Sequence, residues 1–372
     1  MRERLTRFFA SRWGIILAGA IIGVLAPLLQ KLGNPPNMGI CVACFERDIA
    51  GALGLHRAAA VQYIRPEVIG FVLGAMIAAY AFREFRARAG SAPIVRFVLG
   101  MFAMIGALAF LGCPWRATLR LAGGDLNAIL GLAGLAVGIA IGVQFLKAGY
   151  NLGRAQKTHA AVGWIMPLIM VGLLLLLLFA PSFSKDGPIF FSQSGPGSLH
   201  APLLISLAAG LLIGFLAQRT RFCTMGAIRD VILMRDFNLI TGLLTLLVVA
   251  FVMNLILGQV RFGLAGQPVA HSSHLWNFLG MTLSGLAFAL AGGCPGRQLF
   301  LSGEGDGDAA VFVLGMIAGA GFAHNFALAG SPDSVVEGVA KVGGLTPFGM
   351  GAVILGLVVC LAIGLTMRER AA

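Results

Sequence analysis

Long apolar stretches alternate with short polar ones along the whole of this 372-residue chain. An α-helix needs about 20 mostly apolar residues to cross the hydrocarbon core of a bilayer. Ten stretches meet this requirement, at residues 13–30, 67–82, 94–111, 126–146, 160–180, 201–218, 237–258, 274–292, 309–329 and 347–366. The pattern predicts an all-α polytopic membrane protein with about ten transmembrane helices.

The composition agrees with a chain surrounded by lipid. Hydrophobic residues make up 58% of it and charged residues only 11%, whereas a soluble domain carries about 25% charged residues. This balance excludes a soluble enzyme, a disordered protein and a nucleic-acid binder, in spite of the net charge of +12. Six cysteines are too few for a disulfide scaffold in a chain of this length, so free thiols are expected.

The basic residues predict an orientation. Cytoplasmic loops of membrane proteins carry an excess of Lys and Arg. Eighteen of the 27 Lys and Arg residues lie in six segments that the ten spans place on the same side of the membrane, at residues 1–12, 82–96, 147–159, 219–235, 294–308 and 367–372. We therefore expect a multi-pass protein of a prokaryotic inner membrane with both termini cytoplasmic. The loop end that holds His271 and His274 is then external, and both histidines are expected to be solvated.

The chain contains an internal repeat. Two groups of rare residues recur 181 or 182 positions later: Cys41-x5-Arg47-Asp48 as Cys223-x5-Arg229-Asp230, and Gly112-Cys113-Pro114-Trp115-Arg116 as Gly293-Cys294-Pro295-Gly296-Arg297. Equivalent spans lie five apart, an odd number, so the second half is predicted to be inverted relative to the first. The expected division is a first repeat at 13–147, a connector at 148–200, a second repeat at 201–330 and a final loop and span at 331–372. Inverted repeats that meet around a site are typical of transporters.

The cysteine motifs lie between the spans, in stretches too polar to cross a membrane and too apolar for free loops. These stretches are 36–56, 112–123, 221–233 and 293–303, and each is predicted to form a short re-entrant helix, two in each repeat. Such backbone is tolerated at membrane depth only when protein or a cavity surrounds it. The first two are expected on the external side and the last two on the cytoplasmic side. Proline favours the first helical position, which would place Cys113 and Cys294 at helix N-termini, where an anion is stabilised.

Four cysteines are the candidate substrate path: Cys41, Cys113, Cys223 and Cys294. The alternative is that they are small hydrophobic residues of the core, as is expected for Cys360 in the last span. The candidate supporting residues are Cys44, Arg47, Asp48, Arg116, Arg229, Asp230 and Arg297. The two adjacent Arg-Asp pairs are predicted ion pairs that hold the re-entrant helices, with substrate attraction as the alternative. The other two arginines are expected either to face the substrate or to bind carbonyl groups of a neighbouring helix.

These motifs resemble a known family. Two inverted copies, each with a Cys motif followed by a Gly-Cys motif, are similar to the YeeE/YedE membrane proteins over about residues 14–366. The segments Cys41-Val-Ala-Cys44-Phe-Glu-Arg47-Asp48 and Gly-Cys113-Pro-Trp-Arg116 look most like the YedE branch of proposed selenium transporters, whereas the characterised YeeE branch imports thiosulfate. The resemblance implies that cysteines along a central path pass a sulfur-containing anion inward. By motif position it implies that Cys113 and Cys294 are the Gly-Cys residues, and that Cys41 and Cys223 are the entry and exit cysteines.

The leading hypothesis is therefore uptake of a small sulfur- or selenium-containing anion through a cysteine-lined path. It involves no enzyme activity, cofactor or metal site, and a cytoplasmic sulfur-carrier protein is a candidate partner. Two alternatives stay open. One is a membrane thiol–disulfide oxidoreductase that uses Cys41 and Cys44 as a redox pair, and the other is a soft-metal channel with cysteine ligands.

Overall fold

The computed structural model describes residues 2–179, 189–336 and 339–368. Residues 180–188, where the predicted connector continues, lie outside the described residues. Ten helices occupy the ten predicted spans: α2 (Arg12–Lys31), α4 (Pro66–Ala81), α5 (Pro93–Phe110), α7 (Asn127–Lys147), α8 (Ala160–Phe179), α9 (Leu203–Thr220), α11 (Asn238–Ile256), α12 (His274–Ala291), α14 (Gly307–Asn325) and α15 (Pro347–Thr366). Within the described ranges, nine segments are long and apolar enough to cross a membrane, and α4 is a shorter apolar helix. The predicted class, an all-α polytopic membrane protein, is confirmed.

Four short helices lie where the cysteine motifs predict them. They are α3 (Val42–Ala52), α6 (Pro114–Ala122), α10 (Thr224–Met234) and α13 (Pro295–Gly303). All eleven residues of α3 are buried, so this helix lies inside the bundle, where the side chains of the long helices surround it.

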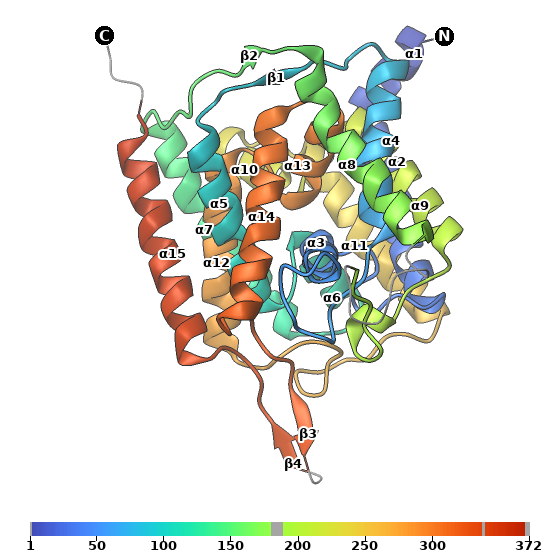
Figure 1. Ribbon diagram of the computed structural model, residues 1–372, viewed down its shortest axis with the longest axis vertical. Helices are drawn as coiled ribbons and strands as arrows, with labels where there is room; N and C mark the ends of the chain where they lie inside the picture. Colours follow the sequence, from blue (N-terminus) through green and yellow to red (C-terminus); the bar gives the residue numbers. More distant parts are fainter. Residues whose placement is uncertain (1, 180–188, 337–338, 369–372) are drawn as a thin grey trace.

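The remaining elements lie at the two ends of the bundle. The N-terminal helix α1 (Arg2–Ala10), the ribbon of β1 (Arg88–Ala89) with β2 (Gln156–Lys157) and the last described residues all lie at one end (Figure 1). The hairpin of β3 (Ser334–Val336) and β4 (Val339–Lys341) extends from the other end, and η2 (Pro196–Ser198) is a single 3-10 turn. The helices α10 and α13 lie nearer the end with the termini, and α3 and α6 nearer the opposite end (Figure 1).

The long helices pack in pairs that join the two halves of the chain. Helix α7 packs against α12 and α5 against α14, while α2 packs against α11 and α4 against α9. The sequence repeat would equate α2 with α9, α4 with α11, α5 with α12 and α7 with α14. When each helix is replaced by its equivalent, the α7–α12 pair becomes the α14–α5 pair, and the α2–α11 pair becomes the α9–α4 pair. A two-fold relation between the halves would produce this pattern. The division at 13–147 and 201–330 itself stays a prediction.

Close helix packing explains part of the high glycine content. A Cβ atom on Gly134 would lie 2.1 Å from the backbone oxygen of Phe278, and one on Gly315 would lie 2.2 Å from that of Phe97. These two contacts are equivalent in the sequence repeat, because Gly315 follows Gly134 by 181 positions and Phe278 follows Phe97 by the same number. Small residues let helix backbones approach closely in a membrane, where association depends on packing.

Apolar side chains also cover the outside of the bundle. On the final helix α15, Leu355 and Val358 are 57% and 58% exposed, and Val248 on α11 is 59% exposed. A soluble monomer rarely exposes apolar surface of this extent, and in a bilayer these side chains would contact lipid. The buried interior, in contrast, contains the four motif cysteines and a set of charged side chains.

Candidate functional site

Each of the four motif cysteines is the residue immediately before a short helix. Cys41, Cys113, Cys223 and Cys294 are the N-caps of α3, α6, α10 and α13. The expected placement of Cys113 and Cys294 at helix N-termini is therefore confirmed, and the other two cysteines have the same position. The first N–H groups of a helix have no partner within the helix, and the helix dipole is positive there. All four thiols thus lie in surroundings that favour negative charge nearby.

Two of the caps also have a side-chain hydrogen bond. The sulfur of Cys41 accepts from the backbone N–H of Cys44, and that of Cys223 accepts from the backbone N–H of Gly226, both at 3.3 Å. Cys44 and Gly226 are equivalent in the sequence repeat. The first cysteine of each half is thus held in the same way.

The structure brings the cysteines together in two pairs. The sulfur atoms of Cys41 and Cys113 lie 3.7 Å apart, and those of Cys223 and Cys294 lie 3.6 Å apart. We call these the first and the second thiol pair. All four residues are buried, with exposed fractions between 0 and 6%, and their thiols are free. Each Gly-Cys cysteine therefore contacts a thiol of its own half of the chain.

The third thiol of the first half, Cys44, lies close to Cys41 and also contacts two other groups. Its sulfur lies 3.9 Å from the carbonyl oxygen of Leu111 and 3.4 Å from Nη1 of Arg116. The sulfur of Cys41 lies 3.7 Å from that of Cys113. The pair that the oxidoreductase hypothesis requires, Cys41 with Cys44, therefore has a third thiol beside it.

The two arginines that follow the Gly-Cys cysteines have different partners. Arg116 is fully buried, and its guanidinium donates to the carbonyl oxygens of Asn37 at 3.2 Å, Val269 at 2.9 Å and Leu111. It therefore has the carbonyl-binding role that was one of the two expectations. Arg297 instead forms an ion pair with Glu304, at 3.5 Å.

Glu304 belongs to a charged network near the end of α13. It also pairs with Arg221 at 3.0 Å, and Arg221 pairs with Glu84 at 2.9 Å. Glu84 in turn accepts from Arg219, at 2.8 Å. The network connects the segment after α4 with the end of α9 and with α13.

The protonation of Glu84 reflects these partners. Partial burial on its own would raise the pKa of Glu84, but the hydrogen bonds from Arg219 and Gln218 and the charge of Arg221 outweigh burial, so the pKa is lowered. The carboxylate form is the one that holds the network together.

Both predicted Arg-Asp ion pairs are present, with very different surroundings. Arg47 and Asp48 lie 2.6 Å apart and are almost completely buried, whereas Arg229 and Asp230 lie 2.8 Å apart with Arg229 30% exposed. Asp48 has a second buried partner, Arg65, also at 2.6 Å. Arg65 was not among the predicted residues, although a charged residue directly before an apolar span is a signal that the sequence offers.

Other buried polar residues also escaped the sequence analysis. Both carboxylate oxygens of Glu46, in the middle of α3, are buried and have no hydrogen-bond partner among the described residues. The fully buried pair of Arg120 and Asp125 spans 2.6 Å. The expectation that His271 is a solvated loop residue is wrong, because its ring is buried and its Nε2 lies 2.7 Å from the carbonyl oxygen of Ala109. Its loop folds back over the bundle.

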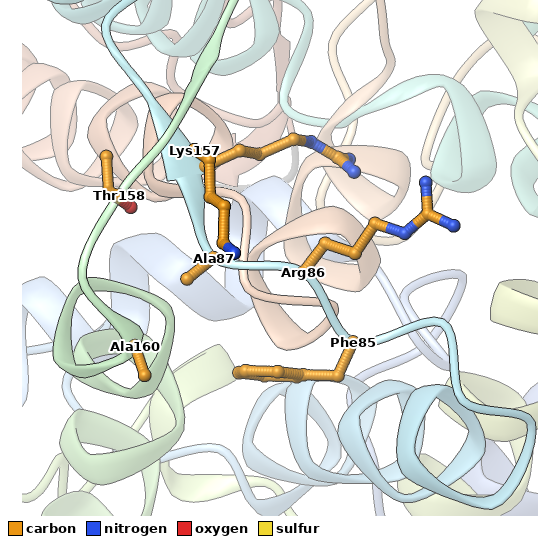
Figure 2. A pocket seen from close by; sticks show the side chains of 7 residues that line it. Phe85, Arg86, Ala87, Lys157, Thr158 and Ala160 are labelled. Carbon is orange, nitrogen blue, oxygen red and sulfur yellow. The ribbon is translucent and has the colours of Figure 1, made fainter.

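A separate cavity of about 640 Å³ lies under the ribbon of β1 and β2. It is lined by Phe85, Arg86, Ala87, Arg88, Lys157, Thr158 and Ala160. Figure 2 shows Lys157 and Thr158 on one side of it and Phe85 and Ala160 on the other. The cavity contains no thiol and lies at the end of the molecule that holds both termini (Figure 1). Among the described residues, no three His, Cys, Asp or Glu side chains are grouped so that they could hold a metal ion.

The fold and the buried thiol pairs define a polytopic membrane protein with a sulfur-rich interior. A family model described as "Sulphur transport" matches residues 2–113 and 219–372, and these two stretches include all four motif cysteines. The chain belongs to this family, the YeeE/YedE membrane proteins.

Several characterised and uncharacterised proteins resemble parts of the chain. Thiosulfate transporter TsuA of Escherichia coli is 31% identical over 107 residues, which is 29% of this chain and 30% of that protein. Thiosulfate transporter TsuA of Spirochaeta thermophila is 33% identical over 99 residues, 27% of this chain and 29% of that protein. An uncharacterized protein of Methanocaldococcus jannaschii, MJ1590, is 31% identical over 98 residues, 23% of this chain and 93% of that protein. The aligned part thus spans about 30% of the length of each thiosulfate transporter.

Proposed function

We propose that this protein imports a small sulfur- or selenium-containing anion across a prokaryotic inner membrane, by way of the two thiol pairs. One observation carries the proposal: each half of the chain places two free thiols within 3.7 Å of one another, both at helix N-termini. The helix ends supply partial positive charge to an anion. The thiols supply a soft, polarizable surface that donates only weak hydrogen bonds.

Weak contacts at several positions suit transport better than one strong site. An anion must be held well enough to leave water and loosely enough to move on. Two thiol pairs in series would provide two such positions, while the two arginines that follow the Gly-Cys cysteines are already paired or bound to carbonyls. Arg116 donates to backbone oxygens and Arg297 pairs with Glu304. Neither arginine would trap the anion as a free buried cation would.

The organisation that we propose around this path is a pair of inverted repeats, each with two re-entrant helices. The reciprocal packing of the long helices supports it. Both termini would be cytoplasmic, in accordance with the distribution of the basic residues. The first thiol pair would then be entered from outside, and the second would face the cytoplasm.

The substrate is a sulfur or selenium oxyanion in this proposal, and selenium is favoured by the motif that begins at Cys41. Release on the cytoplasmic side could involve a sulfur-carrier protein. The cavity with Arg86 and Lys157 lies at the end that would be cytoplasmic, and its basic side chains would attract an acidic partner surface.

Uptake by the purified protein in proteoliposomes tests the proposal. Vesicles that contain the wild-type chain should accumulate radiolabelled thiosulfate faster than empty vesicles, and unlabelled selenite should compete if selenium species are substrates. Sulfate, which lacks a soft sulfur or selenium atom, should compete poorly. Wild-type vesicles that accumulate neither thiosulfate nor selenite above the rate of empty vesicles would refute the proposed function.

A further inference from the structure

Four buried aromatic rings form a cluster between the two halves of the chain. The ring centroid of Trp115 lies 5.8 Å from that of Phe222, 5.9 Å from that of Phe71 and 6.0 Å from that of Phe300. Phe71 and Phe300 also contact each other, at 6.0 Å. All four side chains are almost completely inaccessible to solvent. We call these residues the aromatic cluster, and Trp115 is its centre.

Trp115 comes from the segment of the first thiol pair and contacts both segments of the second. It follows Cys113 by two residues on α6. Its neighbour Phe222 directly precedes Cys223. Gly296 follows Cys294 by two residues, and a Cβ atom on Gly296 would lie 3.2 Å from Cζ2 of Trp115. The indole therefore packs against both segments that carry the second thiol pair, while its own segment carries one cysteine of the first.

The repeat is asymmetric at this position. Position 115 of the first half corresponds to position 296 of the second, and these are Trp and Gly. The indole of the first half thus occupies the space that Gly296 of the second half leaves free. The indole is thus the one large side chain at this position of the repeat, since its counterpart Gly296 has no side chain.

The indole nitrogen has an unusual environment. Its Nε1–H is buried and has no hydrogen-bond partner among the described residues. Buried Trp N–H groups usually find a partner, because an unsatisfied donor costs free energy. A transient ligand that accepts a hydrogen bond would satisfy this donor, and an oxyanion passing between the thiol pairs is such a ligand.

We infer that Trp115 is the gate and a specificity-determining residue of the transport path. Its ring closes the passage between the first and the second thiol pair, and its Nε1–H donates to the anion as the anion passes. This inference rests on the proposed function, because a gate requires a path through the thiol pairs. The alternative is that Trp115 only packs the core.

Three variants separate a gate from a core residue in the proteoliposome assay. Trp115→Ala removes the ring, Trp115→Phe keeps a ring but removes the N–H donor, and Phe288→Ala is the matched control. Phe288 is equally buried, and its ring centroid lies 6.5 Å from that of Phe312, whereas among the described residues no ring contact joins it to the aromatic cluster. It therefore shares the packing loss but not the position between the thiol pairs.

A gate predicts that the two Trp115 substitutions affect different anions. Trp115→Ala should raise sulfate entry by about tenfold, as removal of about 1.4 kcal/mol of barrier would, while Phe288→Ala should not. Trp115→Phe should lower thiosulfate uptake several-fold without raising sulfate entry. Sulfate entry in Trp115→Ala equal to that of Phe288→Ala, together with wild-type thiosulfate uptake in Trp115→Phe, would overturn the inference.

A fluorescence measurement keeps the inference testable if Trp115→Ala does not fold. In a variant with Trp13→Phe, Trp164→Phe and Trp276→Phe, Trp115 is the sole source of tryptophan emission. Its emission should change on addition of thiosulfate and saturate, whereas sulfate should have little effect. Unchanged emission at thiosulfate concentrations that support uptake would overturn the inference. Absence of uptake by the wild type would instead refute the proposed function, so the two failures are distinguishable.

Discussion

Replacement of Asp48 by Asn should destabilise the fold far more than the same replacement of its counterpart in the other half, Asp230. Asp48 is completely buried and accepts from Arg47 at 2.6 and 2.9 Å and from Nε of Arg65 at 2.8 Å, and Nη2 of Arg65 lies 2.6 Å from the same carboxylate. Asn keeps the size of the side chain but removes the negative charge, which leaves two buried guanidinium groups without a counterion.

The expected magnitudes follow from burial. Breaking a buried ion pair by removing one partner costs about 3–5 kcal/mol, because a charge is left uncompensated away from water. Asp230 has one arginine partner, Arg229, which is 30% exposed, so Asp230→Asn should cost about 1 kcal/mol or less. The two substitutions are chemically identical and occupy equivalent positions in the repeat, so each serves as the control for the other.

The assay is reversible unfolding of the purified protein in mixed micelles, followed by circular dichroism. The free energy of unfolding of Asp48→Asn should fall below that of Asp230→Asn by about 2–4 kcal/mol. Equal losses in the two variants would refute the reasoning, because they would mean that the buried cluster around Asp48 is as well solvated as the partly exposed pair. Failure of only Asp48→Asn to accumulate in the membrane would agree with it.

Three further predictions test the packing and the charges. Gly134→Ala should destabilise by about 1–3 kcal/mol through the clash of the new Cβ with the facing backbone oxygen on α12, whereas Gly172→Ala, where no atom lies within 4 Å of such a Cβ, should not. Glu46→Met should stabilise by about 1–2 kcal/mol, because it removes a buried carboxyl group without partners; loss of transport in this stabilised variant would assign Glu46 a functional role. The pKa of Glu84 is lowered in the folded state, so its contribution is complete above the unfolded-state value of about 4.5 and is lost as the pH falls through the folded-state value. The stability deficit of Glu84→Gln should therefore shrink in acid, and a deficit that does not depend on pH would contradict the network with Arg219.

Much of the architecture could be predicted from the sequence because it depends on local patterns. Ten apolar stretches predict the ten long helices, and a cysteine followed by proline predicts the start of a short one. Cys113 precedes α6 and Cys294 precedes α13 as expected. These features need only the residues within one helical segment.

The arrangement of the site could not be predicted, because it depends on contacts between distant segments. Cys41 and Cys113 are 72 positions apart, and nothing in the local sequence distinguishes this pairing from a pairing of the two Gly-Cys cysteines. The second partner of Asp48, Arg65, likewise comes from another element. The role that we propose for Trp115 depends on its contact with Gly296, which only the packing of the two halves reveals.

The most direct test of the central claim is thiosulfate uptake by variants that lack the motif thiols. One variant replaces Cys41, Cys113, Cys223 and Cys294 with Ala, and its control replaces only Cys360, a buried cysteine in the middle of α15. If the thiol pairs form the path, the fourfold variant should insert normally in proteoliposomes and lose uptake, while Cys360→Ala should take up thiosulfate at the wild-type rate. Wild-type uptake by the fourfold variant would contradict the account, since it would mean that the four thiols only pack the core.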